Sequence, residues 1–469
     1  MRVPGIALLG LLFAIASFSA PAGAAGEPSA GKEPAVLTVN ANKVLVERFL
    51  GFGAEWDANG YAANGVTDRD FEVVAKRIRW MRLPVARVMM QAKYVYQGGG
   101  RLDFETPAMK SLCRHLDLCQ QEGIAVILTE WGCEPQWLRP PEISKVDDPK
   151  YAGIIGDYLD HLLVMKGYSC IRYFVLVNEP NYEVKDYGRW QQGLRNVAAA
   201  LAARKLDGRV ALAGADHSNA DDWHARAVKE LSGTLGAYDF HRYASPEEVR
   251  SGKLEAYVRG QWAVALAGDP KAKGKPLIIG EAGLITPGFS ASNNPLHLKY
   301  EYGLQMADYA AQAATAGSWS VLAWMLDDNS HQGFTWGMWA NHENGLKPKP
   351  WFYVWALLAR SFPAGAQILG VEGAPAGLRA LAARIPGKNG DDWSLCLANR
   401  GDAPARLRVR IPGAGRRTLT RYLYSRESAK ADADGFPLPA GVADGDLGAG
   451  CEVECPAESV VFLTGTASR

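Results

Sequence analysis

The sequence predicts an α/β fold, a (β/α)8 barrel followed by a C-terminal antiparallel β-sandwich domain. Between residues 51 and 362, eight short apolar runs alternate with segments of helical periodicity, the repeat expected of a parallel barrel. Some of these runs end abruptly in polar residues, as barrel strands do at their carboxyl ends. Beyond Pro363, short and often alternating runs are divided by Gly, Pro and Asp, which is typical of a sandwich.

The N-terminal residues carry the pattern of a secretory signal. Arg2 precedes an apolar segment at 6–18, and Ala22-Gly23-Ala24 matches an A-x-A cleavage site. The apolar segment is too short to span a bilayer comfortably, and no later segment reaches the roughly eighteen residues that a span needs. We therefore predict a signal peptide at 1–24, a disordered linker at 25–34, and a secreted or periplasmic protein without a membrane anchor after cleavage.

Residues 35–50 are expected to form N-terminal strands that join the β-domain, because apolar and polar residues alternate at 35–40. The next run contains Gly51 and Gly53, which would let the first barrel strand approach its neighbours closely. The barrel is expected to occupy residues 51–362, and the sandwich residues 363–469.

The other elements follow from the positions of apolar runs and periodic segments. A helix at 68–81 is indicated by apolar residues at threes and fours, behind Thr67 or Asp68 as the N-cap. Further helices are expected at 107–123, 154–166, 187–205 and 351–360. The remaining barrel strands are expected at 86–90, 125–131, 173–177, 210–216, 238–243, 276–283 and 320–326. Sandwich strands are expected at 378–385, 393–398, 405–411, 418–424 and 460–463.

The composition is that of an ordinary globular protein, with 48% hydrophobic and 22% charged residues. A chain of 469 residues exceeds the size at which one core keeps growing, so two domains are expected. A net charge of +1 gives no electrostatic reason to expect nucleic acid as a partner, and we expect a monomer. The seven cysteines are odd in number; Cys451 and Cys455 would either close a small disulfide or remain buried free thiols.

Two of the apolar runs end in a carboxylate. The run at 173–177 is followed by Asn178, Glu179 and Pro180, and the run at 276–280 by Glu281. Because Pro180 has no N–H for a sheet ladder, its strand must stop near Glu179. Both glutamates are therefore expected at the carboxyl ends of parallel strands, the face where parallel α/β folds build their active sites.

Asn-Glu-Pro at one strand end, with a second glutamate about a hundred residues further on, resembles clan A of the glycoside hydrolases. These are retaining enzymes built on a (β/α)8 barrel, and the strand entry and β-domain are similar in layout to families thirty and thirty-nine. The resemblance covers roughly residues 50 to 360. It implies that Glu179 is the acid/base and Glu281 the nucleophile.

The resemblance also assigns roles around the nucleophile. Asn178 would hydrogen-bond the sugar 2-hydroxyl. Arg87, with Arg82 as a competing candidate, would contact the nucleophile, lower its pKa and hold it charged. Either His241 or Tyr243, which close the sixth strand, would orient the nucleophile.

Three further residues are candidates for binding the sugar. Trp324 would be either a platform under the ring or a residue of the barrel core. Strand three contributes Trp131 and Glu130, of which Glu130 would be either a ligand of a sugar hydroxyl or a supporting residue behind the site.

The sequence thus predicts a secreted retaining glycoside hydrolase that cleaves β-glycosidic bonds of an oligo- or polysaccharide by double displacement. The alternative is a non-catalytic carbohydrate-binding barrel associated with polysaccharide synthesis or export. No cofactor and no metal are expected, because no H-E-x-x-H occurs and Gly98-Gly99-Gly100 lacks the lysine and following helix of a phosphate loop.

Overall fold

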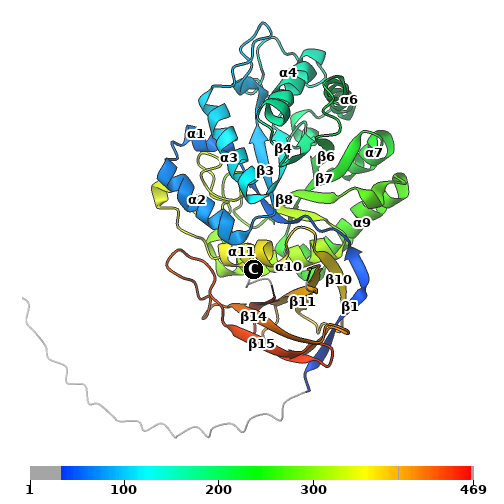
Figure 1. Cartoon of the computed structure of the whole chain (residues 1–469), viewed down its shortest axis with the longest axis vertical. Helices are drawn as coiled ribbons and strands as arrows, with labels where there is room; N and C mark the ends of the chain where they lie inside the picture. Colours follow the sequence, from blue (N-terminus) through cyan, green and yellow to red (C-terminus); the bar gives the residue numbers. More distant parts are fainter. Residues whose placement is uncertain (1–32, 389, 466–469) are drawn as a thin grey trace, which may run out of the picture. The chain divides into compact units, whose positions relative to one another are not determined.

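The computed structural model describes residues 33–388 and 390–465. The expected signal peptide and residues 25–32 of the expected linker lie outside the described residues. From Pro34 onward the described chain forms one compact unit, whose helices and strands are labelled in Figure 1.

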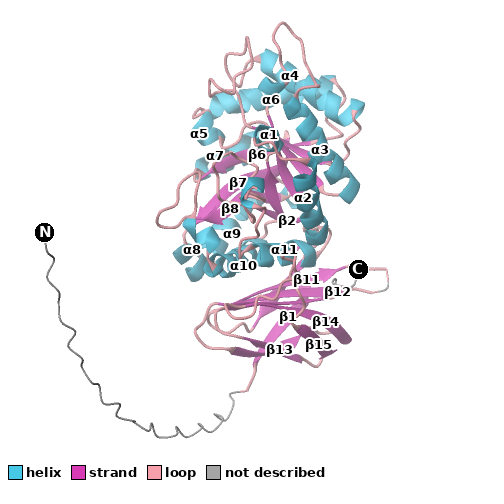
Figure 2. Cartoon of the chain, turned by 90° about the vertical axis from the view of Figure 1, so that its left-hand side faces the viewer, coloured by secondary structure: helices cyan, strands magenta, loops and turns pink. Residues whose placement is uncertain are grey.

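Eight parallel strands close into a barrel with helices around it, which confirms the predicted fold (Figure 2). The strands follow one another in chain order, and the last pairs with the first. They are β2 (Gly51–Trp56), β3 (Val85–Met90), β4 (Ala125–Glu130), β5 (Ile171–Val175), β6 (Ala211–Ser218), β7 (Leu235–Ala244), β8 (Leu277–Leu284) and β9 (Ser320–Ala323).

The helices include all five that the sequence predicts and several that it does not. They are α1 (Ala58–Ala63), α2 (Asp68–Met81), α3 (Pro107–Glu122), α4 (Pro149–Asp160), α5 (Pro180–Glu183), α6 (Tyr187–Ala203), α7 (Asp221–Leu231), α8 (Pro246–Ser251), α9 (Lys253–Gly268), α10 (Tyr300–Thr315) and α11 (Phe352–Ser361). The helix expected at 154–166 begins five residues earlier, because the Asp148 side chain caps it and Pro149 fills its first position. It continues as a π-helix at His161–Met165.

The close approach expected of the first barrel strand occurs at Gly53. A Cβ atom built there would lie 2.3 Å from the carbonyl oxygen of Val85 on β3. Only glycine fits at this distance, so the residue lets β2 and β3 lie side by side at the start of the barrel.

The remaining strands form one mostly antiparallel sheet, in the order β15-β14-β17-β12-β11-β10-β1-β13-β16. The strands at its two ends, β15 and β16, contact each other, so the sheet folds over an apolar core of its own. The N-terminal strand β1 is an inner strand of this sheet, where it pairs with β10 and β13. The bounds are β1 (Ala35–Val46), β10 (Gln367–Glu372), β11 (Leu378–Ile385), β12 (Asp392–Asn399), β13 (Ala405–Arg410), β14 (Arg416–Tyr424), β15 (Gly441–Asp446), β16 (Cys451–Cys455) and β17 (Ser459–Thr464).

All seven cysteines are free thiols, so the proposed Cys451–Cys455 disulfide is wrong and the alternative of buried thiols is confirmed. The two residues are four apart on β16, and both side chains point into the sheet's core with Val453 between them.

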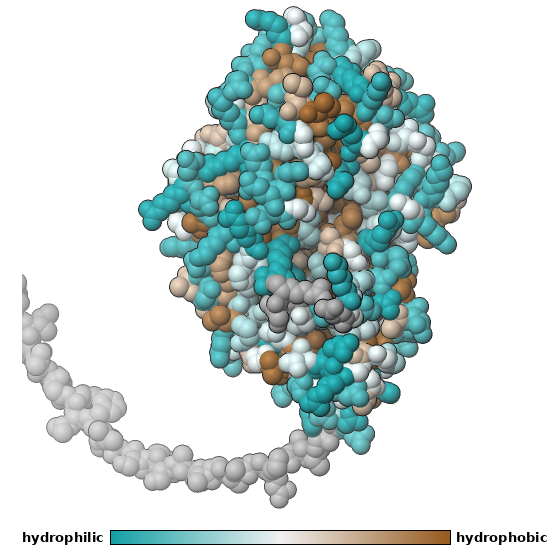
Figure 3. Space-filling view, in the orientation of Figure 1, coloured by the Kyte–Doolittle hydropathy of each residue, from teal (hydrophilic) through white to brown (hydrophobic). Residues whose placement is uncertain are grey.

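No helix in the described part of the chain combines the length and apolarity needed to cross a bilayer. On the face seen in Figure 3, polar and apolar residues are interspersed.

A buried carboxylate joins the barrel helices to the sheet. Asp308 on α10 is fully buried and pairs with Arg379 on β11 at 3.0 Å and with Arg400, just after β12, at 2.6 Å. The Tyr424 hydroxyl on β14 donates to the carbonyl oxygen of Tyr300 at the start of α10. Part of α10 is thus covered by the sheet rather than by solvent.

We predict that a protein truncated after Pro363 does not fold stably, because Asp308 would lose both arginines and a buried charge without a partner is strongly destabilising. Circular dichroism on heating should show loss of the cooperative transition of the full chain. A truncated protein that melts like the full chain and stays fully active would contradict this prediction.

Candidate active site

A cavity of about 330 Å³ lies at the carboxyl ends of the barrel strands. Its lining residues come from the ends of several strands and from the segments that follow them, as in other barrel enzymes. The walls combine carboxylates with aromatic rings, among them Glu179, Glu183, Glu281, Trp131, Trp324 and Trp336.

The two predicted catalytic glutamates meet in this cavity. Glu281 belongs to β8, whereas Glu179 follows β5 and has a left-handed backbone (φ 45°) at the N-cap of α5, where Pro180 begins the helix. A carboxylate oxygen of Glu179, one of Glu281 and a ring nitrogen of His241 all lie within 4.8 Å of one another. The Glu179 side chain is 22% exposed and that of Glu281 only 5%, so the two carboxyl groups differ in their access to solvent.

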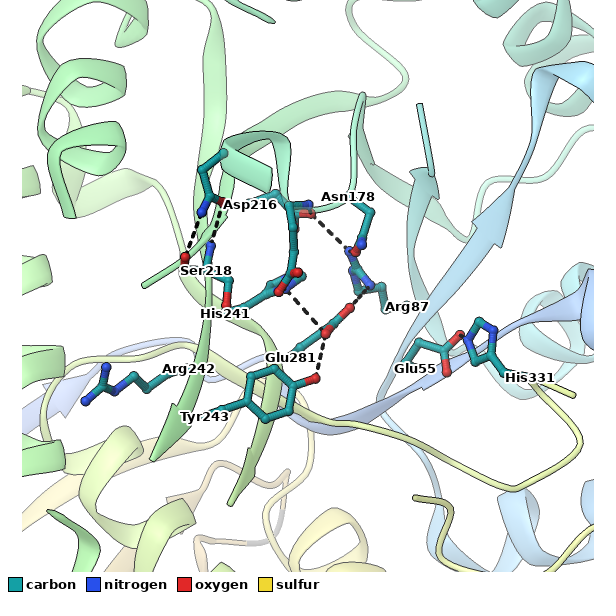
Figure 4. Close-up of polar contacts among 12 residues, drawn as sticks. Glu55, Arg87, Asn178, Asp216, Ser218, His241, Arg242, Tyr243, Glu281 and His331 are labelled. Atoms are coloured by element: carbon teal, nitrogen blue, oxygen red, sulfur yellow. Dashed lines mark hydrogen bonds and ion pairs between the residues drawn. The ribbon is translucent and has the colours of Figure 1, made fainter. Parts of the chain in front are cut away.

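Arg87 contacts Glu281 directly (Figure 4). This fully buried residue of β3 donates from Nη1 to Glu281 Oε1 at 2.8 Å, and from Nη2 to Asn178 Oδ1 at 2.8 Å and Asp216 Oδ2 at 3.0 Å. Its competitor Arg82 is the C-cap residue of α2 and precedes the strand. Of the two arginines, the structure brings Arg87 to the nucleophile position.

Tyr243 and His241, between which the sequence left one predicted role open, both contact Glu281. The Tyr243 hydroxyl donates to Glu281 Oε2 at 2.7 Å. His241 lies between the carboxylates, with Nδ1 3.0 Å from Glu179 Oε1 and 3.4 Å from Glu281 Oε2, and Nε2 3.1 Å from Asp216 Oδ1. Burial disfavours the imidazolium, but Glu281 and Asp216 raise the pKa of His241 well above its usual value. His241 therefore bridges both glutamates, and the carboxylates around it favour its charged form.

As predicted, the neighbouring cation Arg87 acts to lower the pKa of Glu281, but the net shift of that pKa is upward. Burial raises the pKa of Glu281 above its usual value, although His241 and Arg87 act in the opposite direction. The residue types around Glu281 were predicted, but the sequence did not reveal how completely its carboxyl group is removed from water.

Both predicted tryptophans line the cavity. Trp131 follows β4 and Trp324 follows β9, and each contacts the ring of His331, which stacks on Trp324 at 5.1 Å. Trp324 is 7% exposed; it lines the cavity and also packs in an apolar cluster with Met89 and Met325, so each of the two predicted alternatives describes part of its surroundings.

Glu130 does not line the cavity. Its carboxylate is buried at the end of β4 and accepts from the Ala92 N–H through both oxygens, at 3.0 and 3.2 Å. Two roles were predicted for Glu130, a ligand of a sugar hydroxyl or a supporting residue behind the site. Its position agrees with the second. Burial raises the pKa of Glu130 to about 8.

This pKa makes a Glu130→Gln variant a test of stability against pH. Between pH 4.5 and about 8 the folded protein keeps a proton that the unfolded chain has released. Glu130 therefore contributes stability that is complete below pH 4.5 and is lost as the pH rises toward 8. The variant lacks this titration, so its free energy of unfolding relative to wild type should increase by on the order of 3 to 5 kcal/mol across that interval. Urea unfolding of both proteins at several pH values measures this difference. If the free energies of unfolding of wild type and variant change in parallel with pH, Glu130 does not have the raised pKa.

Three acidic residues of the site were not among the predicted site residues. Asp216 lies among Arg87, His241 and Glu179. Burial acts to raise its pKa, but Arg87 and His241 outweigh burial and bring the pKa below its usual value. Glu183 lines the cavity. Glu55, at the end of β2, is fully buried and lies 3.3 Å from His331 (Figure 4). A strand-end signal was present for Asp216 and Glu55, whereas nothing in the local pattern marked Glu183.

No family model matches the sequence, and a search of curated proteins finds no match. Solved structures match over most of the chain. The catalytic domain of GH30 xylanase C from Talaromyces cellulolyticus matches with a TM-score of 0.66 at 12% identity, over 92% of this chain and 99% of that chain. An α-L-arabinofuranosidase from Thermotoga maritima matches with a TM-score of 0.61 at 13% identity, over 92% and 99%. The chain has the fold of these glycosidases. A bacterial orthologue of human α-L-iduronidase has the same glycosidase fold, with a TM-score of 0.65 at 14% identity, over 92% of this chain and 84% of that chain.

On this glycosidase fold, the Glu179, His241 and Glu281 trio also has the spacing of metal ligands. A metal would need a lone pair on the ring nitrogen of His241. Both ring nitrogens instead face carboxylates, which raise the pKa of His241 and so favour the protonated ring. The donor set therefore suits proton transfer better than metal binding.

Proposed function

We propose that the protein is a secreted retaining glycoside hydrolase that cleaves β-glycosidic bonds of an oligo- or polysaccharide by double displacement. The observation that carries the proposal is the carboxylate pair, whose facing oxygens lie within 4.8 Å. Retaining glycosidases hold their two carboxyl groups about 5 to 5.5 Å apart, whereas inverting enzymes need about 6.5 to 9.5 Å to admit a water molecule.

In the first step, Glu281 attacks the anomeric carbon while Glu179 gives its proton to the departing glycosidic oxygen. Arg87 and Tyr243 each donate to one oxygen of Glu281, which fixes the carboxylate in one orientation for attack. As Glu179 loses its proton, the adjacent imidazolium of His241 stabilises the carboxylate that forms.

In the second step, Glu179 removes a proton from water, which displaces Glu281 from the sugar and restores the original anomeric configuration. Asn178 is held at the cavity by Arg87, and we assign it to the sugar 2-hydroxyl. Trp324 and Trp131 supply faces on which the apolar side of a sugar ring stacks. The signal pattern at residues 1–24 supports export, with a mature chain that starts at Ala25.

The proposal is tested by following the anomer that is released first from a glycan library with proton NMR. Retention of the anomeric configuration is expected, and release of the opposite anomer would contradict double displacement. A 2-deoxy-2-fluoro glycoside should label the peptide that contains Glu281. Binding to library members with neither turnover nor labelling would instead favour the non-catalytic barrel associated with polysaccharide synthesis or export.

A further inference from the structure

The cavity presents negative but not positive side chains to a substrate. Its lining includes the carboxyl groups of Glu179, Glu183 and Glu281, of which Glu179 holds the proton that the proposed mechanism transfers, and the other lining residues are aromatic, aliphatic or uncharged polar groups. None of the described lysines and arginines belongs to this lining. The charge of the cavity wall is thus carried by acids alone.

Arg87 and His241, the two basic residues that contact Glu281, already have partners within the protein. Arg87 and His241 are fully buried, and their nitrogens face Glu281, Asp216 and the side chains of Asn178 and Glu179. An anionic group on a substrate would have to displace one of these partners to reach either cation. Breaking a buried ion pair is costly because it leaves one charge uncompensated.

The next cation, Arg242, is also held in place. It donates to Asn219 at 3.2 Å and pairs with Glu248, and its guanidinium lies 4.2 Å from the ring centroid of Tyr257. In Figure 4 its side chain points away from Glu281. Lys349, beyond Trp336, pairs with Asp328 at 2.8 Å. Neither cation is free to turn toward a substrate in the cavity.

Glu183 is an acid that catalysis does not use, and burial and the neighbouring Glu179 raise its pKa above the usual value. It lies at the end of α5, on the wall that also holds Glu179 and Trp131. Lys185 influences Glu183 electrostatically, but it is exposed and is not part of the lining. Within the described chain, neither lysine nor arginine forms an ion pair with Glu183.

We infer that the cavity selects glycosyl residues without an anionic group, that is neutral or amino sugars, and that Glu183 is a specificity residue that repels uronic acids and sulfated sugars. The inference rests on the proposed function, because it concerns the sugar bound between Glu179 and Glu281. A carboxylate or sulfate brought into this cavity would be removed from water with no free cation to receive it, and it would face like charges. An ammonium group would meet carboxylates instead.

The test compares 4-nitrophenyl glycosides in matched pairs, such as β-glucoside with β-glucuronide and β-galactoside with β-galacturonide. We expect kcat/KM to favour the neutral member of each hydrolysed pair by about 100-fold or more. Glu183→Gln should reduce this preference about tenfold, mainly through KM for the uronide, because it removes one repelling charge. Glu72→Gln, which changes an exposed acid on α2, is the matched control and should leave the preference unchanged.

Equal or better hydrolysis of the uronides by the wild-type protein would overturn the inference and leave the proposed function standing, and so would a preference that Glu183→Gln does not alter. If no glycoside is hydrolysed, the proposed function is in question. A glycan array probed with the full chain then still tests whether the cavity excludes sugars with an anionic group. Retention of uronic or sulfated glycans on that array would overturn the inference, as would the absence of binding to any glycan. Retention restricted to neutral and amino glycans would support it without turnover.

Discussion

A Glu281→Gln variant should lose at least about 10⁴-fold in kcat on every glycoside that the wild-type protein hydrolyses. The amide keeps the size of the side chain but has no carboxylate to attack the anomeric carbon. It also removes the anion that Arg87 and His241 face, so those two cations would keep only their other partners. Initial rates on glycosides with good and poor leaving groups would measure the loss, which should be similar for both because the attack itself is disabled.

The matched control is Glu130→Gln, a second buried glutamate at a barrel strand end that lies outside the cavity. Its kcat should stay within about threefold of wild type, since surface and supporting substitutions away from the reacting atoms rarely act on the chemical step. A Glu281→Gln protein that keeps full hydrolysis, or a Glu130→Gln protein that loses as much, would remove the assignment of the nucleophile.

The barrel was predictable because its strands are short apolar runs that stop at polar residues. The apolar run before Asn178 illustrates this. Pro180 has no N–H to donate to a sheet, so β5 must end before it. The helices α9 and α10 were not predicted, because their patterns lack a clear apolar stripe. In α10 nearly every side chain from Met306 to Ala314 is buried, since the barrel lies on one side of the helix and the sheet contacts it as well.

In the β-domain, the predicted strands are those with strong alternation or long apolar runs, such as β11 and β17. The missed strand β15 (Gly441–Asp446) contains two glycines and two aspartates, and it is held by pairing with β14 at the end of the sheet rather than by its own propensity. Its neighbour β16 was read only as a pair of cysteines, although Cys451, Val453 and Cys455 alternate inward as strand residues do.

The candidate site was predictable where a strand end and a residue type coincide, and less so where side-chain direction decides. Strand ends pointed to Glu179 and Glu281, and the resemblance to known glycosidases pointed to Arg87 inside a strand; the structure brings the three together. Glu130 also lies at a strand end, yet its side chain turns to the backbone of Ala92, which the sequence pattern does not reveal. Asp216 was placed at a strand end without a role, because its importance comes from contacts with residues from three other strands and strand ends.

A Glu179→Gln variant should lose activity in proportion to how poor the leaving group is. For an alkyl glycoside or an oligosaccharide, loss of the general acid should lower kcat/KM by about 10² to 10⁴-fold. For a 4-nitrophenyl glycoside the leaving phenolate needs little protonation, so kcat/KM should fall much less. Hydrolysis of the covalent intermediate should then limit kcat, because no base activates the water.

Added azide separates this role from a structural one. As a nucleophile that needs no general base, azide should restore kcat of Glu179→Gln on the nitrophenyl glycoside and yield a glycosyl azide of retained configuration. Azide should not restore Glu281→Gln in the same way, because that variant forms no glycosyl intermediate. Because Glu179 is 22% exposed while Glu281 is 5% exposed, an external nucleophile has access on the side of the acid/base. Equal losses on both classes of leaving group, without rescue by azide, would mean that Glu179 does not move the proton.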